Sequence, residues 1–371
     1  MTTDRIGLAV IGCGSIGRVR ALLARETVAF GWLGVCDVDE ELLRRVGAET
    51  AADLVTSDFR ELLDRPEVTA VIVATPERAH VEPVLVAVER GLPLLIEKPL
   101  AIDLGESARV LQAIEDHSVD AVIGYTQRFR RRFQTVKQRL RDGQIGDVTS
   151  VVTRTFMNRM VPVATLGRTD VRQNLTPMVL SGTHSLDICM WLMEGKTPVE
   201  VYARSTDATF GELGAQDATF GVFTMDDGAL WSMNINWALP MVWPGAVYGM
   251  EIGIVGTRGV IDIEDTHRDV ILASEIPQDI PPAARGYDPN AARHVDFIGS
   301  YPPGDVSDGL LWGPMREETM TWFSRLTTGL ATPHATAREG HRNLMLTMAM
   351  DLSARTGEPV RLPIEVDALV A

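Results

Sequence analysis

The sequence has little of what marks several large protein classes. It contains only 3 cysteines in 371 residues, and no apolar run reaches the roughly 18 residues that a membrane-spanning helix needs. Basic residues are fewer than acidic ones, and the formal net charge of -15 would repel the phosphates of nucleic acids and of anionic lipids. We therefore expect neither a nucleic acid nor a membrane as a partner, and a small molecule as the ligand.

Signatures of several enzyme classes are missing as well. Neither a GxSxG turn nor a P-loop occurs, and the 7 histidines form no cluster with metal-ligand spacing, so no metal ion is expected. Cys13, Cys36 and Cys189 lie in apolar surroundings, as reduced packing residues do in a reducing compartment. Residues 1–4 lead directly into an apolar run without a charged leader, which favours a cytoplasmic protein.

The chain is long and apolar enough for two cores, with a hydrophobic fraction of 45%. Up to about residue 124, short apolar runs alternate with stretches of helical period, which indicates a parallel sheet covered on both faces. These runs are residues 6–11, 32–36, 70–74, 94–96 and 121–123. The sequence predicts a doubly wound α/β domain over residues 1–124.

The rhythm changes in the rest of the chain. An amphipathic helix is expected near residues 181–194, followed by strand-like runs at 199–204, 218–225, 230–237 and 250–255. The turn Asp226-Asp227-Gly228 is typical of a hairpin. Residues 278–304 resemble a long irregular excursion, and closing helices are expected at 316–328 and 338–354. We predict an α+β domain over residues 125–371, built on a mostly antiparallel open sheet that joins subunits into a homodimer or homotetramer.

A glycine motif, Gly12-Cys-Gly-Ser-Ile-Gly17, stands directly after the first apolar run and opens a helical stretch. There Gly12 permits a tight turn, Gly14 lets the backbone approach a diphosphate, and Gly17 lets helix and strand pack closely. The helix N-terminus, with Ser15 and Ile16, would hold the diphosphate. A glycine turn without a ligand is the alternative. The strand-turn-helix context favours a Rossmann dinucleotide-binding domain.

Asp37 indicates which dinucleotide is bound. It ends the second apolar run, 20 residues after Gly17 in the sequence, where a carboxylate accepts hydrogen bonds from the ribose hydroxyls of NAD. A 2′-phosphate would meet a cluster of negative charge that continues through Asp39, Glu40 and Glu41. The sequence therefore favours NAD over NADP.

Lys98 follows the fourth apolar run, in the triplet Glu97-Lys98-Pro99. Ligands bind at the carboxyl ends of parallel strands in open α/β sheets, and burial beside a cofactor would suit a lysine to proton transfer. The alternative is a surface ion pair between Lys98 and Glu97. The residues alone do not decide between the two.

Taken together, these segments resemble the glucose-fructose oxidoreductase/inositol dehydrogenase (Gfo/Idh/MocA) family. The resemblance covers essentially the whole chain and implies hydride transfer between NAD and a carbon that bears a hydroxyl or carbonyl, in a sugar, cyclitol or cyclic diol. The motifs that carry it are Gly12–Gly17, Ala74-Thr75-Pro76 with His80, Glu97–Pro99, Gly124–Phe129, Gly143–Gly146 and His184-Ser-Leu-Asp187.

Residue by residue, the resemblance implies that Lys98 hydrogen-bonds the reacting oxygen and that His184 relays the proton. It adds Thr75, Pro76, His80 and Glu97 to the residues that contact NAD. His184 shares a predicted helix face with Asp187, which could orient its ring, although such a histidine is also often a core residue. The family usually has an aspartate four residues before this histidine, whereas Leu180 stands there in this chain.

An apolar Leu180 cannot accept the substrate proton, so Lys98 and His184 share that work or another group reaches the site. Between residues 153 and 174 the chain carries four arginines and a single acid, which fits an anionic substrate as well as surface ion pairs or subunit contacts. The residues expected to contact substrate are Tyr125, Arg128, Arg154, Arg159, Arg168, Arg172, Asn174, Thr183 and His184.

The function predicted from these features is NAD-dependent oxidation of a ring hydroxyl in a polyhydroxylated substrate, including an anionic one. One alternative is a redox-neutral glycosidase that acts on a sulfonated or carboxylated glycoside by transient oxidation, elimination, hydration and re-reduction. Leu180 and the arginines fit this alternative about as well. A second alternative is a non-enzymatic regulator that binds NAD.

Overall fold

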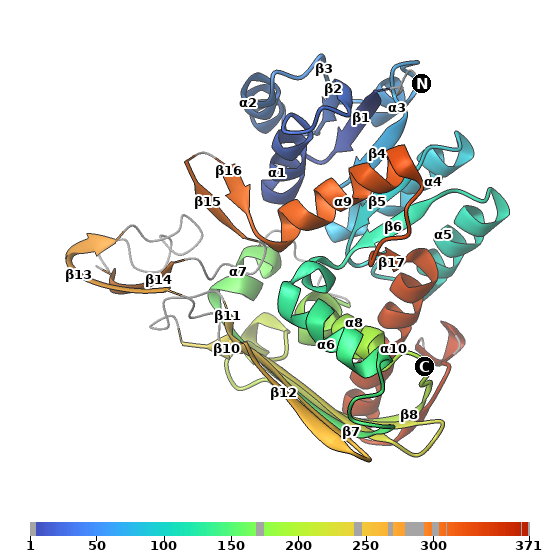
Figure 1. Cartoon of the computed structure of the whole chain (residues 1–371), viewed down its shortest axis with the longest axis vertical. Coiled ribbons are helices and arrows are strands. Elements are labelled where there is room, and N and C mark those ends of the chain that lie inside the picture. Colours follow the sequence, from blue (N-terminus) through green and yellow to red (C-terminus); the bar gives the residue numbers. More distant parts are fainter. Residues whose placement is uncertain are drawn as a thin grey trace. The chain divides into compact units, whose positions relative to one another are not determined.

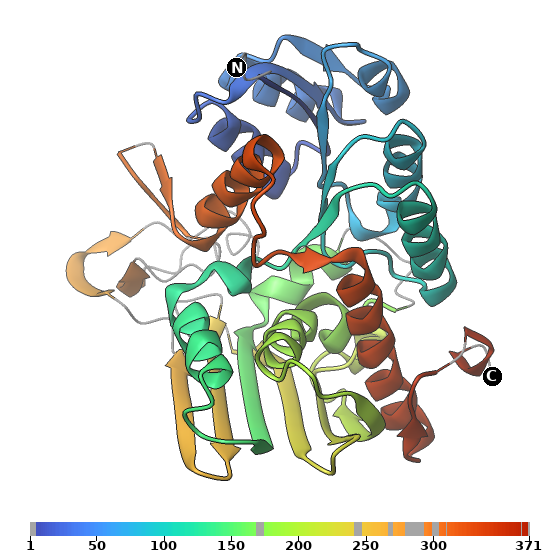
Figure 2. The ribbon, with the colours of Figure 1, turned by 45° about the vertical axis from the view of Figure 1, so that its right-hand side comes forward.

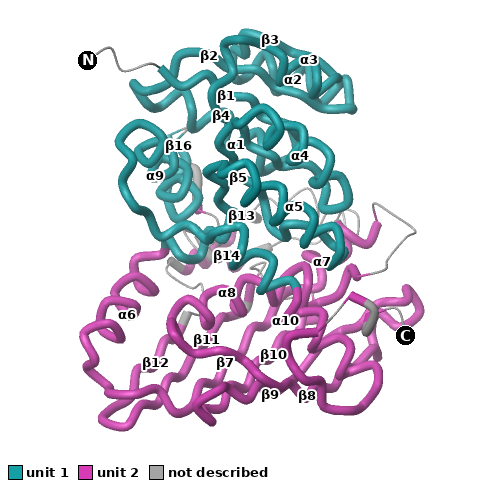
Figure 3. Tube along the Cα trace, turned by 90° about the vertical axis from the view of Figure 1, so that its right-hand side faces the viewer, with its two compact units in different colours: residues 1–129, 306–344 teal, residues 130–305, 345–371 magenta. Residues whose placement is uncertain are grey.

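The computed structural model describes residues 5–167, 174–240, 247–265, 270–278, 293–298, 304–308, 310–364 and 366–369. The chain divides into two compact units, shown in Figure 3. Unit 1 comprises residues 1–129 and 306–344, and unit 2 comprises residues 130–305 and 345–371. A parallel sheet in the first unit and a mostly antiparallel sheet in the second confirm the predicted fold class. The domain boundary at residue 124 stays a prediction.

Unit 1 is built on a seven-stranded sheet in the order β17-β6-β5-β4-β1-β2-β3 (Figure 1). Strands β1–β6 pair in parallel, and only β17 runs antiparallel, against β6. The strands are β1 (Ile6–Ile11), β2 (Phe30–Cys36), β3 (Leu54–Thr56), β4 (Ala70–Val73), β5 (Leu94–Glu97), β6 (Ala121–Gly124) and β17 (Ala335–Thr336). The central strands are apolar throughout because both faces of the sheet are buried.

Helices cover both faces of this sheet. Leu8 and Val10 of β1 share one core with α1 (Ser15–Ala24), α2 (Glu40–Thr50) and α9 (Pro314–Thr328). Ala9 and Ile11, which point to the opposite face, share the other core with α3 (Phe59–Leu63), α4 (Val81–Glu89) and α5 (Leu104–Asp116). The predicted closing helix at 316–328 is therefore α9, which lies on the same face of the sheet as α1.

Unit 2 contains a second seven-stranded sheet, ordered β12-β11-β7-β10-β9-β8-β18. Its pairs are antiparallel except that β7 and β10 run parallel. Helices α6 (Arg131–Arg141) and α8 (Thr183–Leu192) lie against one face of the sheet, as Figure 2 shows. The strands are β7 (Val148–Asn158), β8 (Pro198–Thr206), β9 (Ala218–Met225), β10 (Leu230–Leu239), β11 (Val247–Gly256), β12 (Gly259–Asp265) and β18 (Val360–Arg361).

Strand β7 is the main element that the sequence analysis did not recognise, although it lies in the middle of this sheet. Val151, Thr153 and Thr155 are buried and alternate with the exposed Val152 and Arg154. Because two of the buried positions are threonines, the alternation does not show as a hydrophobic pattern. The predicted strands correspond to β8–β11, and Gly228 in the predicted hairpin turn has φ 85°.

The remaining elements are short, apart from α10 (Ala337–Thr356), the second closing helix. Within the irregular excursion expected at 278–304, the structure describes residue 278, strand β14 and residue 304. The other residues of this segment lie outside the described ranges. The other elements are β13 (Val270–Gln278) with β14 (Arg293–Ile298), β15 (Asp305–Ser307), β16 (Leu310–Trp312), α7 (Met160–Leu166), the π-helical turn η3 (Met178–Gly182), and the 3-10 turns η1 (Glu77–Ala79), η2 (Thr126–Phe129), η4 (Gly211–Leu213) and η6 (Val366–Leu369).

Candidate active site

The glycine turn after β1 has the geometry that a dinucleotide requires. Gly12 has φ 96°, and a Cβ there would lie 2.5 Å from the backbone of Ala74. A Cβ at Gly17 would lie 1.8 Å from the carbonyl oxygen of Gly12. Gly14 differs, because a Cβ there would meet nothing within 4 Å. Two glycines are therefore needed by the fold itself, and the third leaves open space at the N-terminus of α1, beside the exposed Ser15 and the half-buried Ile16.

Asp37, directly after β2, is held beside this turn. Its Oδ2 accepts the backbone N–H of Cys13 at 2.6 Å, and its Oδ1 accepts the backbone N–H of Asp39 at 3.0 Å. The carboxylate is half-buried. Asp39 in turn caps α2 by accepting the N–H groups of Glu41 and Leu42. The turn and the predicted ribose-binding acid thus form one hydrogen-bonded unit.

His80 joins the ends of β4 and β5. Its Nδ1 lies 2.9 Å from the carbonyl oxygen of Pro99, and its Nε2 lies 2.9 Å from that of Thr75. The ring is buried, and burial lowers the pKa of His80 although both carbonyl oxygens favour the charged form. With both ring nitrogens facing backbone carbonyls, His80 supports the turns that carry Thr75 and Lys98 rather than offering a nitrogen to a ligand.

Four strand ends therefore meet at one edge of the parallel sheet, since Gly12, Asp37, Thr75 and Lys98 follow β1, β2, β4 and β5. Among the described residues, the buried Oγ1 of Thr75 has no hydrogen-bond partner. Pro76 beside it is exposed, and Lys98 is half-buried. A buried hydroxyl without a partner, an open glycine turn and a fixed carboxylate fit a polar, extended ligand at this edge, and NAD is such a ligand.

Glu97, the residue before Lys98, is engaged by the protein itself. Its Oε1 accepts Nε of Arg20 at 2.7 Å and lies 2.5 Å from Nη2 of the same guanidinium. The contact of Glu97 with Arg20 gives this carboxylate a partner within unit 1. A contact of Glu97 with NAD stays a prediction.

His184 lies at the start of α8 in unit 2 and is half-buried, next to the fully buried Thr183. The inner side of α8 is fixed to the sheet, because Sγ of Cys189 lies 3.0 Å from Oγ1 of Thr153, which also accepts the indole N–H of Trp231 at 2.8 Å. Asp187 is completely buried. Lys98 belongs to unit 1 and His184 to unit 2, and their meeting in one site stays a prediction.

The turn before His184 is a π-helix that the sequence did not reveal. π-helical turns occur often at functional sites because the extra residue changes the direction of the side chains. Leu180 in this turn is 5% exposed and packs in an apolar cluster with Leu175, Phe210 and Trp237. The position at which the family resemblance leads one to expect an aspartate is therefore part of a hydrophobic core in this protein.

Three of the predicted substrate arginines lie in the described part of the chain, and each has partners within the protein. Arg154 lies on the face of the sheet opposite to α8 and pairs with Glu251, so within one chain it cannot join His184 in a site. Arg128 is 2% exposed and pairs with Glu339 at 2.9 Å, and its contact with substrate stays a prediction. Arg159 is half-buried and donates to the carbonyls of Ala238 and Leu239, next to the cluster around Leu180. Arg168 and Arg172 lie outside the described residues.

A contact of Arg159 with an anionic group of the substrate stays a prediction. Tyr125 is fully buried at the end of β6. Asn174 is half-buried with φ 60°, a conformation that asparagine tolerates better than most residues. Contacts of these two residues with substrate stay predictions.

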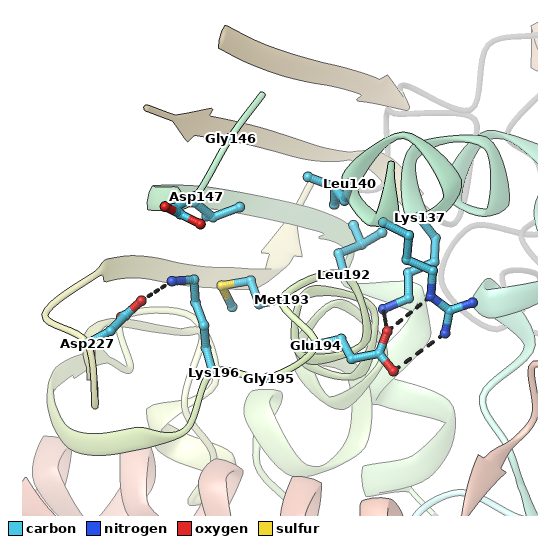
Figure 4. A pocket seen from close by; sticks show the side chains of 12 residues that line it. Lys137, Leu140, Gly146, Asp147, Leu192, Met193, Glu194, Gly195, Lys196 and Asp227 are labelled. Atoms are coloured by element: carbon cyan, nitrogen blue, oxygen red, sulfur yellow. Dashed lines mark hydrogen bonds and ion pairs between the residues drawn. The ribbon is translucent and has the colours of Figure 1, made fainter. Parts of the chain in front are cut away.

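Unit 2 also contains a pocket of about 330 Å³ between α6 and the turn after α8 (Figure 4). Glu194 lies 2.8 Å from Lys137 and 3.1 Å from Arg141, and these two cations lower its pKa to about 2. Lys196 pairs with Asp227 in the same pocket. Because each cation already faces a carboxylate, we assign this pocket no ligand. Over the described ranges, no group of three or more His, Cys, Asp or Glu side chains is placed to hold a metal, and no helix is long and apolar enough to cross a membrane.

Comparison with known proteins identifies the family. Residues 6–125 match the family model described as "Oxidoreductase family, NAD-binding Rossmann fold", and residues 133–262 match the "GFO/IDH/MocA C-terminal domain". The chain belongs to the GFO/IDH/MocA family. It is an NAD-binding oxidoreductase whose cofactor domain is of the Rossmann type, as the sequence motifs predicted.

Among relatives in this family, myo-inositol dehydrogenase Hyg17 of Streptomyces leeuwenhoekii is 28% identical over 94% of this chain and 98% of its own. Inositol 2-dehydrogenase of Gluconacetobacter diazotrophicus is 32% identical over 52% of this chain and 55% of its own. The 2,7-anhydro-N-acetylneuraminate hydratase of Mediterraneibacter gnavus is 27% identical over 70% and 67%. Scyllo-inositol dehydrogenase of Lactobacillus casei, solved with NAD(H) and scyllo-inositol, shares the fold with a TM-score of 0.74 and 16% identity, over 96% of this chain and 99% of its own.

Sequence reasoning missed the residues that hold Glu97. Arg20 is fully buried in α1 of this GFO/IDH/MocA protein and contacts both Glu97 and the fully buried Glu318 of α9. One signal was available, because Glu318 stands on the same helical stripe as the buried Met315 and Trp322. A carboxylate on a core-facing stripe requires a buried cation, and Arg20 on the buried side of α1 is that cation.

Proposed function

We propose that the protein oxidises a ring hydroxyl of a sugar, cyclitol or cyclic diol, including an anionic one, with NAD+ as the acceptor. The observation that carries the proposal is the edge of the parallel sheet where the glycine turn, Asp37, Thr75 and Lys98 follow adjacent strands. Two inositol dehydrogenases among the relatives support a cyclitol or a similar ring as the substrate.

The residues that would hold NAD are those with the matching geometry. The open turn at Gly14 and the N-terminus of α1 receive the diphosphate, with Ser15 and Ile16 beside it, and Asp37 accepts the hydroxyls of the adenosine ribose. Thr75 and Pro76 would contact NAD as well, and the cofactor would give the buried hydroxyl of Thr75 a hydrogen-bond partner. NAD+ supplies the acceptor for the hydride that leaves the carbinol carbon.

Lys98 and His184 handle the proton. Lys98 hydrogen-bonds the substrate oxygen, and the proton of the hydroxyl passes to Lys98 or His184 as the C–O bond gains its double-bond character. The carbon loses a hydride and the oxygen a proton, so the products are the ketone, NADH and one proton. Leu180 accepts no proton, which leaves this work to the two basic residues.

Two domains divide the work in this proposal. Residues 1–124 bind NAD, and residues 125–371 bind substrate and join subunits. In this proposal Arg159, Arg168 and Arg172 would contact an anionic group of the substrate. The outer face of the unit 2 sheet exposes Val152, Phe220, Val222 and Leu230, which favours burial against a second copy in a homodimer or homotetramer.

A second candidate is redox-neutral cleavage of an anionic glycoside, in which the hydride returns to the substrate after elimination and hydration. Two observations support this second candidate: the apolar surroundings of Leu180, and the hydratase among the relatives. One assay separates the two. Incubation of each substrate with a stoichiometric amount of NAD+ should give one NADH per ketone if the protein is a dehydrogenase. Release of an aglycone with catalytic NAD+ and no accumulation of NADH would support the second candidate.

A further inference from the structure

Arg20 lies at the centre of a largely buried network in unit 1. Its Nη2 is 2.7 Å from Oε2 of Glu318 and 2.5 Å from Oε1 of Glu97, so one nitrogen contacts two carboxylates. Its Nη1 donates to Oγ1 of Thr319 at 2.8 Å. Oε2 of Glu318 also accepts the hydroxyl of Thr126 at 2.9 Å. The network joins α1, β5, η2 and α9.

The charges of this network are unequal, because one guanidinium serves two carboxylates. The side chains of Arg20 and Glu318 are 0% exposed and that of Glu97 is 13% exposed. Burial, which outweighs the attraction of Arg20, raises the pKa of Glu318 to about 7. The backbone carbonyl of Glu318 faces Nε2 of His334 at 3.1 Å. Loss of Arg20 would leave two carboxylates without their cation, and loss of Glu318 would remove one of the groups that fix the orientation of the Arg20 guanidinium.

Glu97 transmits this arrangement to the end of β5. Its carboxylate is held by Arg20 on one side, and on the other side Oε2 stands 3.0 Å from the point where a Cβ of Gly124 would lie. Strand β6 therefore leaves room for Glu97 only because Gly124 has no side chain. With Glu97 fixed, the backbone from which Lys98 projects is fixed as well.

We propose that Glu318 is a positioning residue for Lys98, because it orients Arg20, and Arg20 holds the Glu97 carboxylate next to that lysine. The proposal rests on the proposed function, since it takes Lys98 to contact the reacting oxygen. Helix α9 thereby controls the geometry at the end of β5. A displacement of about 1 Å at a reacting group is enough to slow a reaction strongly.

The test compares Glu318→Gln with Asp120→Asn. Both substitutions are isosteric and each removes a carboxylate that pairs with a guanidinium in unit 1, because Asp120 accepts from Arg325 of α9 at 2.7 Å. Asp120 has no described contact with Glu97, so it reports on the loss of an ion pair alone. We expect Glu318→Gln to lower kcat about tenfold or more while KM for NAD+ stays within about twofold. Asp120→Asn should leave kcat unchanged.

Thr319→Val provides a milder variant that removes one hydrogen bond from Arg20 without any change in charge, and it should lower kcat by about two- to threefold. In a Lys98→Ala background, Glu318→Gln should change residual turnover less than about twofold, because a residue that acts through Lys98 has nothing left to position. If Glu318→Gln and Thr319→Val both leave kcat within error of Asp120→Asn, the proposal is overturned. If instead Lys98→Ala keeps full turnover, the proposed function fails, which is a separate outcome.

Discussion

The backbone N–H of Cys13 donates to Oδ2 of Asp37 at 2.6 Å, which ties the glycine turn after β1 to the carboxylate after β2. Asp37 therefore supports the glycine turn, and we propose that it also binds the adenosine ribose of NAD. Both roles depend on its oxygens as acceptors. The charge of Asp37 adds discrimination against a 2′-phosphate.

Replacement of Asp37 by asparagine should weaken NAD binding by about tenfold or more, because Asp37 uses one oxygen for the N–H of Cys13 and the other for that of Asp39, and asparagine keeps only one acceptor oxygen. Discrimination against NADP should fall as well. Asp39→Asn is the matched control, since it removes the same charge two residues away and keeps an oxygen to cap α2. Titration of each variant with NAD+ and NADP+ by fluorescence or calorimetry measures the effect. Equal losses in the two variants would contradict a specific role for Asp37.

Gly14 provides a test that separates folding from cofactor binding. Gly14→Ala should leave the free energy of unfolding unchanged, since a Cβ there meets nothing within 4 Å, but should weaken NAD binding because the methyl group occupies the space of the diphosphate. Gly12→Ala should reduce both, because its Cβ would lie 2.5 Å from the backbone of Ala74. Denaturant unfolding and NAD+ titration on the same samples decide the matter. Unchanged NAD affinity in Gly14→Ala would place the diphosphate elsewhere.

Leu180→Asp would introduce the carboxylate that relatives carry, but into an apolar cluster. We expect the substitution to lower the free energy of unfolding by about 3–5 kcal/mol, since a carboxylate there has no cation to pair with among the cluster residues. Turnover should not rise. Leu180→Met, which conserves volume, should cost less than about 1.5 kcal/mol. A stable and more active Leu180→Asp variant would show that the position faces the substrate and not the core.

His334 should make the protein sensitive to acid. Burial, the larger cause, and the nearby Arg20, Arg325 and Arg128 lower its pKa to about 3. In the unfolded chain the ring takes a proton near pH 6.5, so between about pH 6.5 and 3 the unfolded state binds more protons and stability falls as the pH falls. Glu318, with its raised pKa, acts in the opposite direction. The effect of His334 is therefore measured as a difference between variants.

The free energy of unfolding of His334→Gln should fall less steeply than that of the wild type between pH 7 and about pH 4. The exposed His117 provides the control variant, His117→Gln, which should follow the wild type. Parallel pH curves for all three proteins would show that His334 is not buried in its neutral form.

The outer face of the unit 2 sheet predicts an oligomer. Val222→Lys should convert the assembled protein to a smaller species, because a charge would be buried at the centre of the exposed apolar surface on β9. Val28→Lys provides a control at a position that is 95% exposed and lies in unit 1. Light scattering after size-exclusion chromatography measures the mass of each. A monomeric wild type, or an unchanged mass in Val222→Lys, would contradict the proposed interface.

Much of unit 1 could be predicted because its signals are local. The continuous apolar strands, the glycine motif and Asp37 are all recognised within short stretches of chain, and the parallel sheet confirms the predicted strands. The contact between Arg20 and Glu318 joins residues 298 positions apart, and no local pattern shows which buried cation meets which buried acid.

Unit 2 was harder to predict because polar residues line its buried positions. The threonines of β7 concealed a central strand, and as a result Arg154 was expected near the substrate although strand alternation directs it to the opposite face. The π-helical turn around Leu180 also has no sequence signature of its own. Its extra residue changes the angle between the side chains of Leu180 and His184 around the helix axis. Counting four residues back from His184 therefore identifies Leu180 but does not show what surrounds it.

The most direct test of the account is the formation of NADH by the wild type and by Lys98→Ala, over a panel of cyclitols and neutral and anionic sugars. NAD+ binding is measured in parallel. The account predicts one NADH per molecule of ketone for at least one ring substrate, and loss of that turnover in Lys98→Ala with NAD+ affinity retained. Turnover that persists in Lys98→Ala, or the absence of hydride transfer from every substrate of the panel, would contradict it.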